Sequence, residues 1–266
     1  MKEVIELILK KKELAGISED VVLKEINKLL DAKTSGLIKE KRFRSMQFKT
    51  FVKKVRAVLR RQFGAFKNPE IDNAGLIAKK NYYSIMMSHL SSKERMPYYK
   101  EVYEKIFRTT GNPKSIIDLG CGFNPLSIEY MGYFPKKYLA LDINSNDLAI
   151  IQEYFNQKKI NGSVKVFDAT NLENYDFVEK FDLCFAFKVF EILEKTKSHR
   201  LTEEIVKKIP SETIIASFST KTLSNAPNKR KRRVWFEVMS KRLGYSIESF
   251  SIPNEIFYIL KKSIVF

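Results

Sequence analysis

Three aspartates and two glycines have the types and the spacing expected of a site for a nucleoside-like ligand. Asp118 is followed by Gly120 and Gly122, and Asp142 and Asp168 come later in the chain. A carboxylate accepts hydrogen bonds from vicinal hydroxyls or from an amino group, and glycine lets the backbone approach a ligand because it has no Cβ. Each residue alone also has a purely structural alternative. The glycines fit a tight turn without a ligand, and each aspartate fits a solvated acid in a turn.

Short apolar segments must position these residues. Each aspartate lies at or next to the end of such a segment, and segments of this kind are typical of buried strands. The expected strands are 115–119, 138–143, 164–167, 182–187, 213–218, 246–251 and 256–262. Helices expected over 126–133 and 145–158 and around 203–208 separate the first five strands, which predicts a parallel sheet with covering helices, and the last two strands should form an antiparallel pair. A further helix is expected over 77–90, before the sheet. Ligands of open α/β sheets bind at the carboxyl ends of strands, so the three aspartates are expected to lie at one edge.

The glycine loop favours a cofactor without phosphates. The dinucleotide fingerprint has a third glycine, and Pro125 occupies that place. S-adenosylmethionine fits the remaining pattern. Asp142 is predicted to accept from the ribose hydroxyls, while Asp118 and its loop hold the methionine ammonium directly or through water. Asp168 stands where methyltransferases often place an acid or amide for the adenine amino group, and the same role is expected here.

At these residues the sequence resembles the class I S-adenosylmethionine methyltransferases and, more narrowly, the Arm/Rmt-type 16S ribosomal RNA methyltransferases of aminoglycoside resistance, which modify guanine N7. The segments that carry the resemblance are Asp118–Leu126, Lys93–Pro97, Ser217–Ser224 and Val234–Glu237. They lie in the family's order over about the last two thirds of the chain, whereas residues 1–80 share only helical, basic character. The resemblance implies an α/β fold, a Rossmann-like class I methyltransferase sheet with an N-terminal all-helical domain. It also implies that Arg95 binds the cofactor carboxylate. The alternative for Arg95 is an ion pair with Glu94 or Glu101.

Several methylation chemistries are disfavoured by the residues after the fourth expected strand. Amino methylation of adenine or cytosine usually needs an Asn/Asp-Pro-Pro-Tyr/Phe motif, but residues 187–190 read Phe-Lys-Val-Phe. Cytosine C5 methylation needs a cysteine nucleophile, and neither Cys121 nor Cys184 is well placed. Enzymes that methylate the ribose 2′-O often use a Lys-Asp-Lys-Glu tetrad. Lys188 and Lys221 could be its lysines, but the aspartate expected after the fourth strand is missing.

Guanine N7 remains, because it is a nucleophile that needs no general base, only in-line placement. We assign Lys188 and Lys221 to acceptor positioning, by contact with phosphate or guanine O6. An extruded guanine needs a stacking partner, and the aromatic candidates are Phe123, Phe187, Phe190 and Trp235; core packing is the alternative for each.

The charge of the chain indicates a polyanionic partner. The net charge is +17, and residues 1–112 carry 25 basic and 13 acidic side chains. The cations predicted to bind RNA lie on a helix expected over 39–63 and in the basic run 228–233 before a helix ending near 243. They are Arg42, Arg44, Lys53, Lys54, Arg60, Arg61, Arg230, Arg232 and Arg233. The alternative is an ordinary solvated, lysine-rich surface.

These observations predict two domains, a basic helical RNA-binding domain over 1–112 and a methyltransferase domain over 113–266. With only two cysteines, we expect no disulfide framework or metal site and a cytoplasmic location. Because no run of about 20 apolar residues occurs, we expect no membrane span. The partners expected are ribosomal RNA and the small ribosomal subunit, bound by a monomer. Methylation of another RNA such as tRNA, or of another position, and a non-catalytic cofactor- and RNA-binding role remain alternatives.

Overall fold

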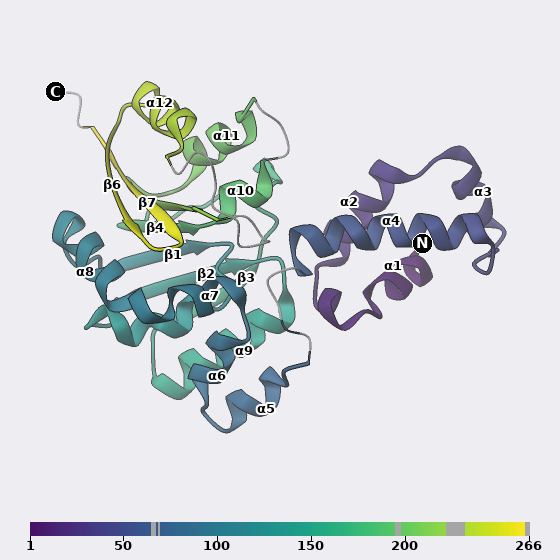
Figure 1. Cartoon of the computed structure of the whole chain (residues 1–266), viewed down its shortest axis with the longest axis horizontal. Coiled ribbons are helices and arrows are strands. Elements are labelled where there is room, and N and C mark those ends of the chain that lie inside the picture. The colour runs from purple at the N-terminus through teal and green to yellow at the C-terminus, as the bar shows by residue number, and fades with distance from the viewer. Residues whose placement is uncertain (65–67, 69, 195–197, 222–231, 264–266) are drawn as a thin grey trace.

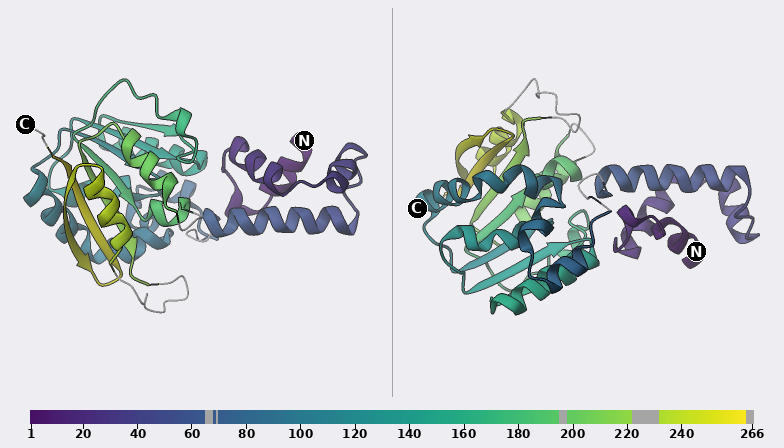
Figure 2. Two further views of the ribbon diagram at one scale, coloured as in Figure 1. Left: turned by 90° about the horizontal axis from the view of Figure 1, so that it is seen from above. Right: turned by 60° about the horizontal axis from the view of Figure 1, so that its bottom comes forward.

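The computed structural model describes residues 1–64, 68, 70–194, 198–221 and 232–263. Within these residues the chain forms a seven-stranded sheet covered by helices and a helical lobe that projects from it (Figures 1 and 2). The sheet order is β3-β2-β1-β4-β5-β7-β6. The strands are β1 (Ser115–Leu119), β2 (Lys137–Asp142), β3 (Gly162–Val166), β4 (Leu183–Phe187), β5 (Thr213–Ser219), β6 (Tyr245–Ile252) and β7 (Glu255–Lys262).

The strand directions confirm the predicted sheet. β1 to β5 pair in parallel, and β7 runs antiparallel to both β5 and β6. Side chains alternate between the two faces, so β4 places Phe185 in one core and Cys184 in the other. The carboxyl ends of β1, β2 and β4 therefore meet at one edge, as the parallel arrangement requires.

Each face of the sheet has its own helical layer. The first core includes buried side chains from α5 (Asn73–Ala78), α6 (Tyr82–Met87), α8 (Tyr99–Thr110), η4 (Asn124–Met131) and α9 (Ser145–Lys158). The second core includes side chains from α10 (Val189–Leu193), α11 (Arg200–Lys208) and α12 (Val234–Arg242). The short helices α7 (Leu90–Arg95), η3 (Met96–Tyr98) and η5 (Leu172–Asn174) complete this part of the described chain.

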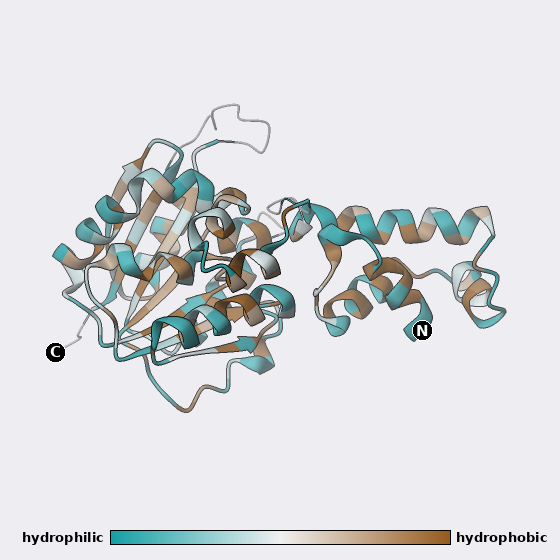
Figure 3. Ribbon diagram, turned by 90° about the horizontal axis from the view of Figure 1, so that it is seen from below, coloured by the Kyte–Doolittle hydropathy of each residue, from teal (hydrophilic) through white to brown (hydrophobic). Residues whose placement is uncertain are grey.

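The N-terminal lobe has a separate hydrophobic cluster. Its elements are α1 (Lys2–Leu9), η1 (Lys12–Leu14), α2 (Glu19–Leu29), α3 (Ala32–Lys39) and α4 (Met46–Gln62). The long helix α4 shows alternating polar and apolar bands in Figure 3, with Phe48, Val55 and Leu59 fully buried. Its apolar face thus packs on α1 to α3 while its basic face is exposed.

Three expected helices differ from the observed ones. The helix expected over 39–63 is interrupted, because the chain turns at Lys41, with φ of 53°, and restarts where the Ser45 hydroxyl accepts from the backbone N–H of Phe48. A single helix over 77–90 is likewise wrong, since Asn81 caps α6 separately from α5. The segment after the glycine loop is the 3₁₀ helix η4 rather than an α-helix.

The predicted domain division at residue 112 stays a prediction. Buried side chains of α8, such as Tyr103 and Ile106, share a core with Ile116 and Phe185 of the sheet. The lobe formed by α1 to α4 (residues 1–62) is the part that has its own cluster.

Candidate cofactor and acceptor site

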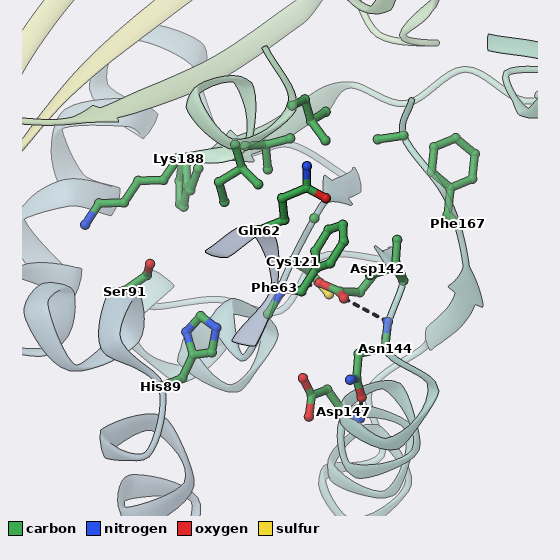
Figure 4. Close-up of a pocket in the computed structure, with 18 of the residues that line it drawn as sticks. Gln62, Phe63, His89, Ser91, Cys121, Asp142, Asn144, Asp147, Phe167 and Lys188 are labelled. Carbon is green, nitrogen blue, oxygen red and sulfur yellow. Dashed lines mark hydrogen bonds between the residues drawn. The ribbon is translucent and has the colours of Figure 1, made fainter. Parts of the chain in front are cut away.

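A cleft opens at the carboxyl ends of β1, β2 and β4, where the sequence places the three aspartates. It spans about 950 Å³ of space not filled by atoms, part of it open to solvent. Of the predicted cofactor residues, Arg95, Gly120, Gly122, Asp142 and Asp168 line it, and Asp118 is buried beneath the glycine loop. Figure 4 shows how side chains from several elements converge there.

Asp142 is held in one orientation at the end of β2. Its Oδ2 accepts a hydrogen bond from the backbone N–H of Gly122 (3.0 Å), and its Oδ1 accepts from the N–H of Asn144 (3.0 Å). Each carboxylate oxygen can accept a second hydrogen bond. The carboxylate is thus preorganised to accept from two vicinal hydroxyls.

The glycine loop requires its glycines for two reasons. Gly120 has φ of 60° and Gly122 has φ of 49°, in the left-handed region that disfavours other residues. A Cβ on Gly120 would lie 2.6 Å from Cγ2 of Val189, and one on Gly122 would lie 3.0 Å from Cε1 of His89. The loop therefore packs tightly below α10 and beside His89.

Asp118 is a buried carboxyl with neutral partners. Its Oδ2 accepts from the Tyr138 hydroxyl (2.6 Å) and from Nδ2 of Asn124 (2.9 Å). Its Oδ1 is buried and has no hydrogen-bond partner among the described residues. Burial raises the pKa of Asp118 to about 7, although the Asn124 and Tyr138 hydrogen bonds and the charge of Arg95 lower it.

Asp168 is held by its own turn and by the N-terminal lobe. Oδ1 accepts from the backbone N–H (2.8 Å) and hydroxyl (2.7 Å) of Thr170. Oδ2 accepts from Nζ of Lys24 in α2 (3.2 Å). A residue 144 positions away in the sequence therefore takes part in the placement of this carboxylate.

Arg95 forms an ion pair that the sequence did not indicate. Its Nε lies 3.0 Å from Oε2 of Glu255, and Nη2 lies 3.1 Å from Oε1, with side-chain exposures of 2% and 1%. Nη1 donates to Tyr99 (3.4 Å) and Asn124 (3.3 Å). The alternatives Glu94 and Glu101 are thus not its partners. Glu255 opens β7, and its sequence signal is an acid directly before the apolar segment 256–260.

Opposing effects set the protonation of Glu255. Burial acts to raise its pKa, but the charges of Arg95 and Lys188 and the hydrogen bonds from Arg95 and Ser217 outweigh burial, so the pKa is lowered. Burial likewise acts to lower the pKa of Arg95, and Glu255 overcomes it, so that pKa is raised. The two groups form a buried ionised pair.

The two predicted acceptor lysines lie in different places. Lys188 lines the cleft directly after β4, with φ of 59°, and its Nζ lies 2.6 Å from Glu94 and 3.6 Å from Glu255. Lys221 follows β5, where its backbone N–H donates to the Ser219 hydroxyl (3.2 Å). The structure brings Lys188, and not Lys221, to the lining of the cleft.

The aromatic stacking candidates are mainly structural in this state. Phe123 and Phe190 are 1% and 0% exposed and belong to the two cores. Trp235 stacks on His199 with ring centroids 3.7 Å apart. Only Phe187 among these four lines the cleft, and the guanidinium of Arg95 lies 4.8 Å from its ring centroid.

The predicted RNA-binding cations of the lobe are all exposed: Arg42, Arg44, Lys53, Lys54, Arg60 and Arg61. Arg60 and Arg42 also form surface ion pairs, with Glu13 (2.5 Å) and Glu40 (3.4 Å). Such pairs are weak in water and exchange readily for a phosphate. The exposed positions are compatible with the prediction and do not test it.

The second predicted group of RNA-binding cations is only partly described. Arg230 lies outside the described residues. Arg232 forms an exposed pair with Glu237. Arg233 is mostly buried, where Nη2 lies 2.5 Å from Glu191 and donates to the backbone carbonyl of Ser219 (2.8 Å). Its contacts tie α12 to α10 and β5, so a phosphate role for Arg233 stays a prediction.

Both cysteines are unsuited to nucleophilic catalysis. Burial raises the pKa of Cys121 and of Cys184 well above the usual value, so each stays a thiol.

Among the described residues, no cluster of His, Cys, Asp and Glu has the composition of a metal site. No helix in that same part of the chain is long and apolar enough to cross a membrane.

Comparison with known proteins finds similarity to ribosomal RNA methyltransferases. A family model described as "Ribosomal RNA methyltransferase (FmrO)" matches residues 42–259. A protein of Frankia casuarinae named 16S rRNA (guanine(1405)-N(7))-methyltransferase is 27% identical over 180 residues, covering 66% of this chain and 62% of that protein. A protein of the same name from Micromonospora echinospora is also 27% identical, with 66% and 64% covered. The chain thus spans less than two thirds of the length of either relative.

Solved structures match over nearly the whole chain. The 16S rRNA methylase RmtB has a TM-score of 0.74 and 22% identity, with 98% of both chains covered. The 16S rRNA methyltransferase RmtF in complex with S-adenosyl-L-homocysteine has a TM-score of 0.78 and 20% identity, again with 98% of both chains covered. At these identities the likeness concerns the fold. It confirms the predicted class I methyltransferase sheet with an N-terminal helical part.

Proposed function

The chain belongs to the ribosomal RNA methyltransferase (FmrO) family, and on this premise we propose that it transfers a methyl group from S-adenosylmethionine to guanine N7 of 16S ribosomal RNA. The name of the Frankia relative specifies guanine 1405, which we take as the target. The observation that carries the proposal is the cleft that both Asp142, held by Gly122 and Asn144, and Lys188 line, at the ends of β2 and β4 on either side of β1.

The residues of the cleft fit the cofactor. The buried Oδ1 of Asp118 lacks a partner among the described residues and suits a ligand ammonium, directly or through water. Gly120 and Gly122 line the cleft with bare backbone, which a ligand can approach closely because no Cβ stands there. Asp142 offers two fixed oxygens for ribose hydroxyls, and Asp168 offers a carboxylate for an adenine amino group.

Arg95 is proposed to bind the cofactor carboxylate, but most of its N–H donors are already engaged within the protein. A guanidinium has five N–H donors. Two of them point to Glu255, and Nη1 is engaged with Tyr99 and Asn124. One hydrogen of Nη2 remains, which favours a single hydrogen bond to the carboxylate over a bidentate pair.

The proposed chemistry needs placement rather than proton removal. When bound, the cofactor supplies a methyl group on a sulfonium sulfur. Guanine N7 carries a free lone pair, so the task of this chain is to hold the base in line and exclude water. Lys188 lies at the cleft wall, fixed by Glu94 and Glu255, and is proposed to donate to guanine O6 or to a phosphate. Lys221 is proposed to act outside the cleft, on the RNA backbone.

The proposed partner is the small ribosomal subunit. Exposed cations of the lobe, among them Lys53, Lys54 and Arg61, provide a basic surface on α4, the helix whose end lines the cleft. Phosphate contacts of this kind position a protein on RNA without reading its sequence. We further propose that the protein works as a monomer in the cytoplasm, where ribosomal subunits assemble.

The test is transfer of radiolabelled methyl from S-adenosylmethionine to 30S subunits, free 16S RNA and tRNA in parallel. Asp142→Ala is expected to lose transfer by at least about 100-fold, because the ribose would lose both acceptors. The matched control is Asp176→Ala at an exposed position, which should transfer at the wild-type rate. Aniline cleavage should then map N7-methylguanine to one nucleotide.

The outcomes separate the alternatives. Label in tRNA alone would contradict the ribosomal target and retain the chemistry. Label in 16S RNA that resists aniline cleavage would contradict N7 as the acceptor. Intact cofactor binding with no label in any RNA would support a non-catalytic binding role.

A further inference from the structure

We propose that the lobe formed by α1 to α4 is a structural part of the cofactor site, and that Lys24 is a positioning residue that orients Asp168 toward the cofactor. This inference rests on the proposed function, because it assigns Asp168 to the adenine amino group. Three independent contacts between the lobe and the cleft support it.

The first contact fixes Asp168. Lys24 Nζ donates to Asp168 Oδ2 (3.2 Å) and to the Thr170 hydroxyl (2.6 Å). Thr170 itself donates twice to Oδ1. Because each carboxylate oxygen accepts about two hydrogen bonds, Oδ1 is saturated and Oδ2 keeps one site. Lys24 therefore decides how the remaining acceptor of Asp168 is presented.

The second contact holds the loop that follows Asp142. Ser145 N–H donates to the Gly16 carbonyl (2.8 Å), and Nδ2 of Asn144 donates to the Ala15 carbonyl (2.9 Å). Gly16 has φ of 82°, and a Cβ there would lie 2.7 Å from Oδ1 of Asn144. The backbone N–H of Asn144 is one of the two donors that orient Asp142. Residues 15 and 16 thus brace the ribose side of the cleft.

The third contact forms part of the cleft wall. Gln62 and Phe63, at the end of α4, line the cleft together with Asp142 and Asp168. Figure 4 draws both residues among the side chains that line the cleft. Gln62 is only 8% exposed. The lobe therefore supplies side chains to the cleft in addition to bracing it.

The experiment compares binding of S-adenosylhomocysteine to full-length variants by calorimetry. We expect Lys24→Met to weaken binding about five-fold or more, with transfer at saturating cofactor within two-fold of wild type. Lys24→Arg should restore most of the affinity, because it retains a cationic donor. The Lys24 side chain is 38% exposed, so the difference from wild type should shrink as salt rises from 0.05 to about 0.5 M.

The matched control is Lys28→Met, which removes the same charge one turn later in α2. Lys28 pairs with Glu25 (2.7 Å) rather than with Asp168, and its variant should bind within two-fold of wild type. Thermal unfolding of each variant checks that the lobe stays folded.

Wild-type affinity in Lys24→Met, with weakened binding in Asp168→Ala, would overturn this inference and leave the proposed function intact. Wild-type affinity in Asp168→Ala would instead remove the adenine assignment on which the inference depends. Equal losses in Lys24→Met and Lys28→Met would show a general charge effect and would also overturn the positioning role.

Discussion

Asp118 and Glu255 are buried carboxyl groups close to the same guanidinium, yet their surroundings give them opposite pKa shifts. Glu255 contacts two cations, Arg95 and Lys188, and its pKa is lowered in spite of burial. The hydrogen-bond partners of Asp118, Asn124 and Tyr138, are neutral, and burial raises its pKa to about 7. An anion at Asp118 therefore becomes favourable when a cationic ligand group enters, which suits a residue that holds an ammonium.

The raised pKa of Asp118 predicts a pH-dependent stability for the free protein. The pKa is raised from 3.8 to about 7, so the folded state keeps a proton that the unfolded state releases. The free energy of unfolding should therefore fall as pH rises through this window, by about 2 kcal/mol between pH 5 and 7, and level off above it. Urea unfolding of wild type and Asp118→Asn from pH 5 to 8 measures this difference. Parallel pH profiles of the two proteins would contradict the assignment.

At the scale of elements, the turn from β1 into η4 carries the cofactor loop. Pro125 stands in the first turn of η4, where its fixed φ suits the start of a helix. Gly120 and Gly122 both have left-handed backbone conformations next to packed side chains. Gly132, which ends η4, has φ of 77° but open space at its Cβ position. The two kinds of glycine differ only in what surrounds them.

This difference predicts unequal costs for two alanine substitutions. Gly132→Ala should lower the free energy of unfolding by about 1–2 kcal/mol, the cost of a left-handed alanine. Gly120→Ala should cost clearly more, because its Cβ would lie 2.6 Å from Cγ2 of Val189, and it should also weaken cofactor binding. Urea unfolding and calorimetry measure both effects. If the two variants were destabilised equally and cofactor affinity did not change, α10 would have to move aside to admit the new methyl group without affecting the site.

At the scale of the whole molecule, charge is distributed unequally between two parts that meet at the cleft. The lobe carries several of its exposed cations on α4, among them Lys53, Lys54 and Arg61, and the end of that helix reaches the cleft through Gln62 and Phe63. The same lobe thus carries the cations proposed to contact phosphates and supplies part of the wall of the proposed cofactor site. Figure 2 shows the end of α4 that adjoins the sheet. Binding of RNA and binding of cofactor are therefore expected to use adjacent surfaces of a single lobe.

This arrangement predicts a salt-dependent contribution of α4 to subunit binding. Lys53→Gln combined with Lys54→Gln should weaken binding to 30S subunits and reduce the slope of log K against log salt by about 0.7–0.9 per lost phosphate contact. The control is Lys136→Gln with Lys180→Gln, exposed positions near the amino ends of β2 and β4. Filter binding at several salt concentrations measures the slopes. Equal slopes in both double variants would place the RNA surface elsewhere.

The sequence by itself determined the strands of the sheet, their parallel or antiparallel direction and the residues of the glycine loop. Apolar segments that end in aspartates specify buried parallel strands locally, and the parallel rule then gathers Asp142 and Asp168 at one edge. The resemblance to a methyltransferase family, read from short motifs such as residues 118–126, was confirmed by the family match. These features depend on residue types and spacing within a few positions, so no distant contact was needed to predict them.

Only the tertiary structure decided the partners of the site residues. Glu255 lies 160 residues from Arg95, and Lys24 lies 144 residues from Asp168. Nothing local marks such pairs, because an ion pair depends on where the chain brings two side chains together and not on their spacing in the sequence. The interruption of the basic helix at Lys41 and the place of Gln62 in the cleft wall depend on packing in the same way. Local patterns in the sequence thus specify the helices and strands. Long-range packing determines the surroundings of each carboxyl group and therefore its protonation.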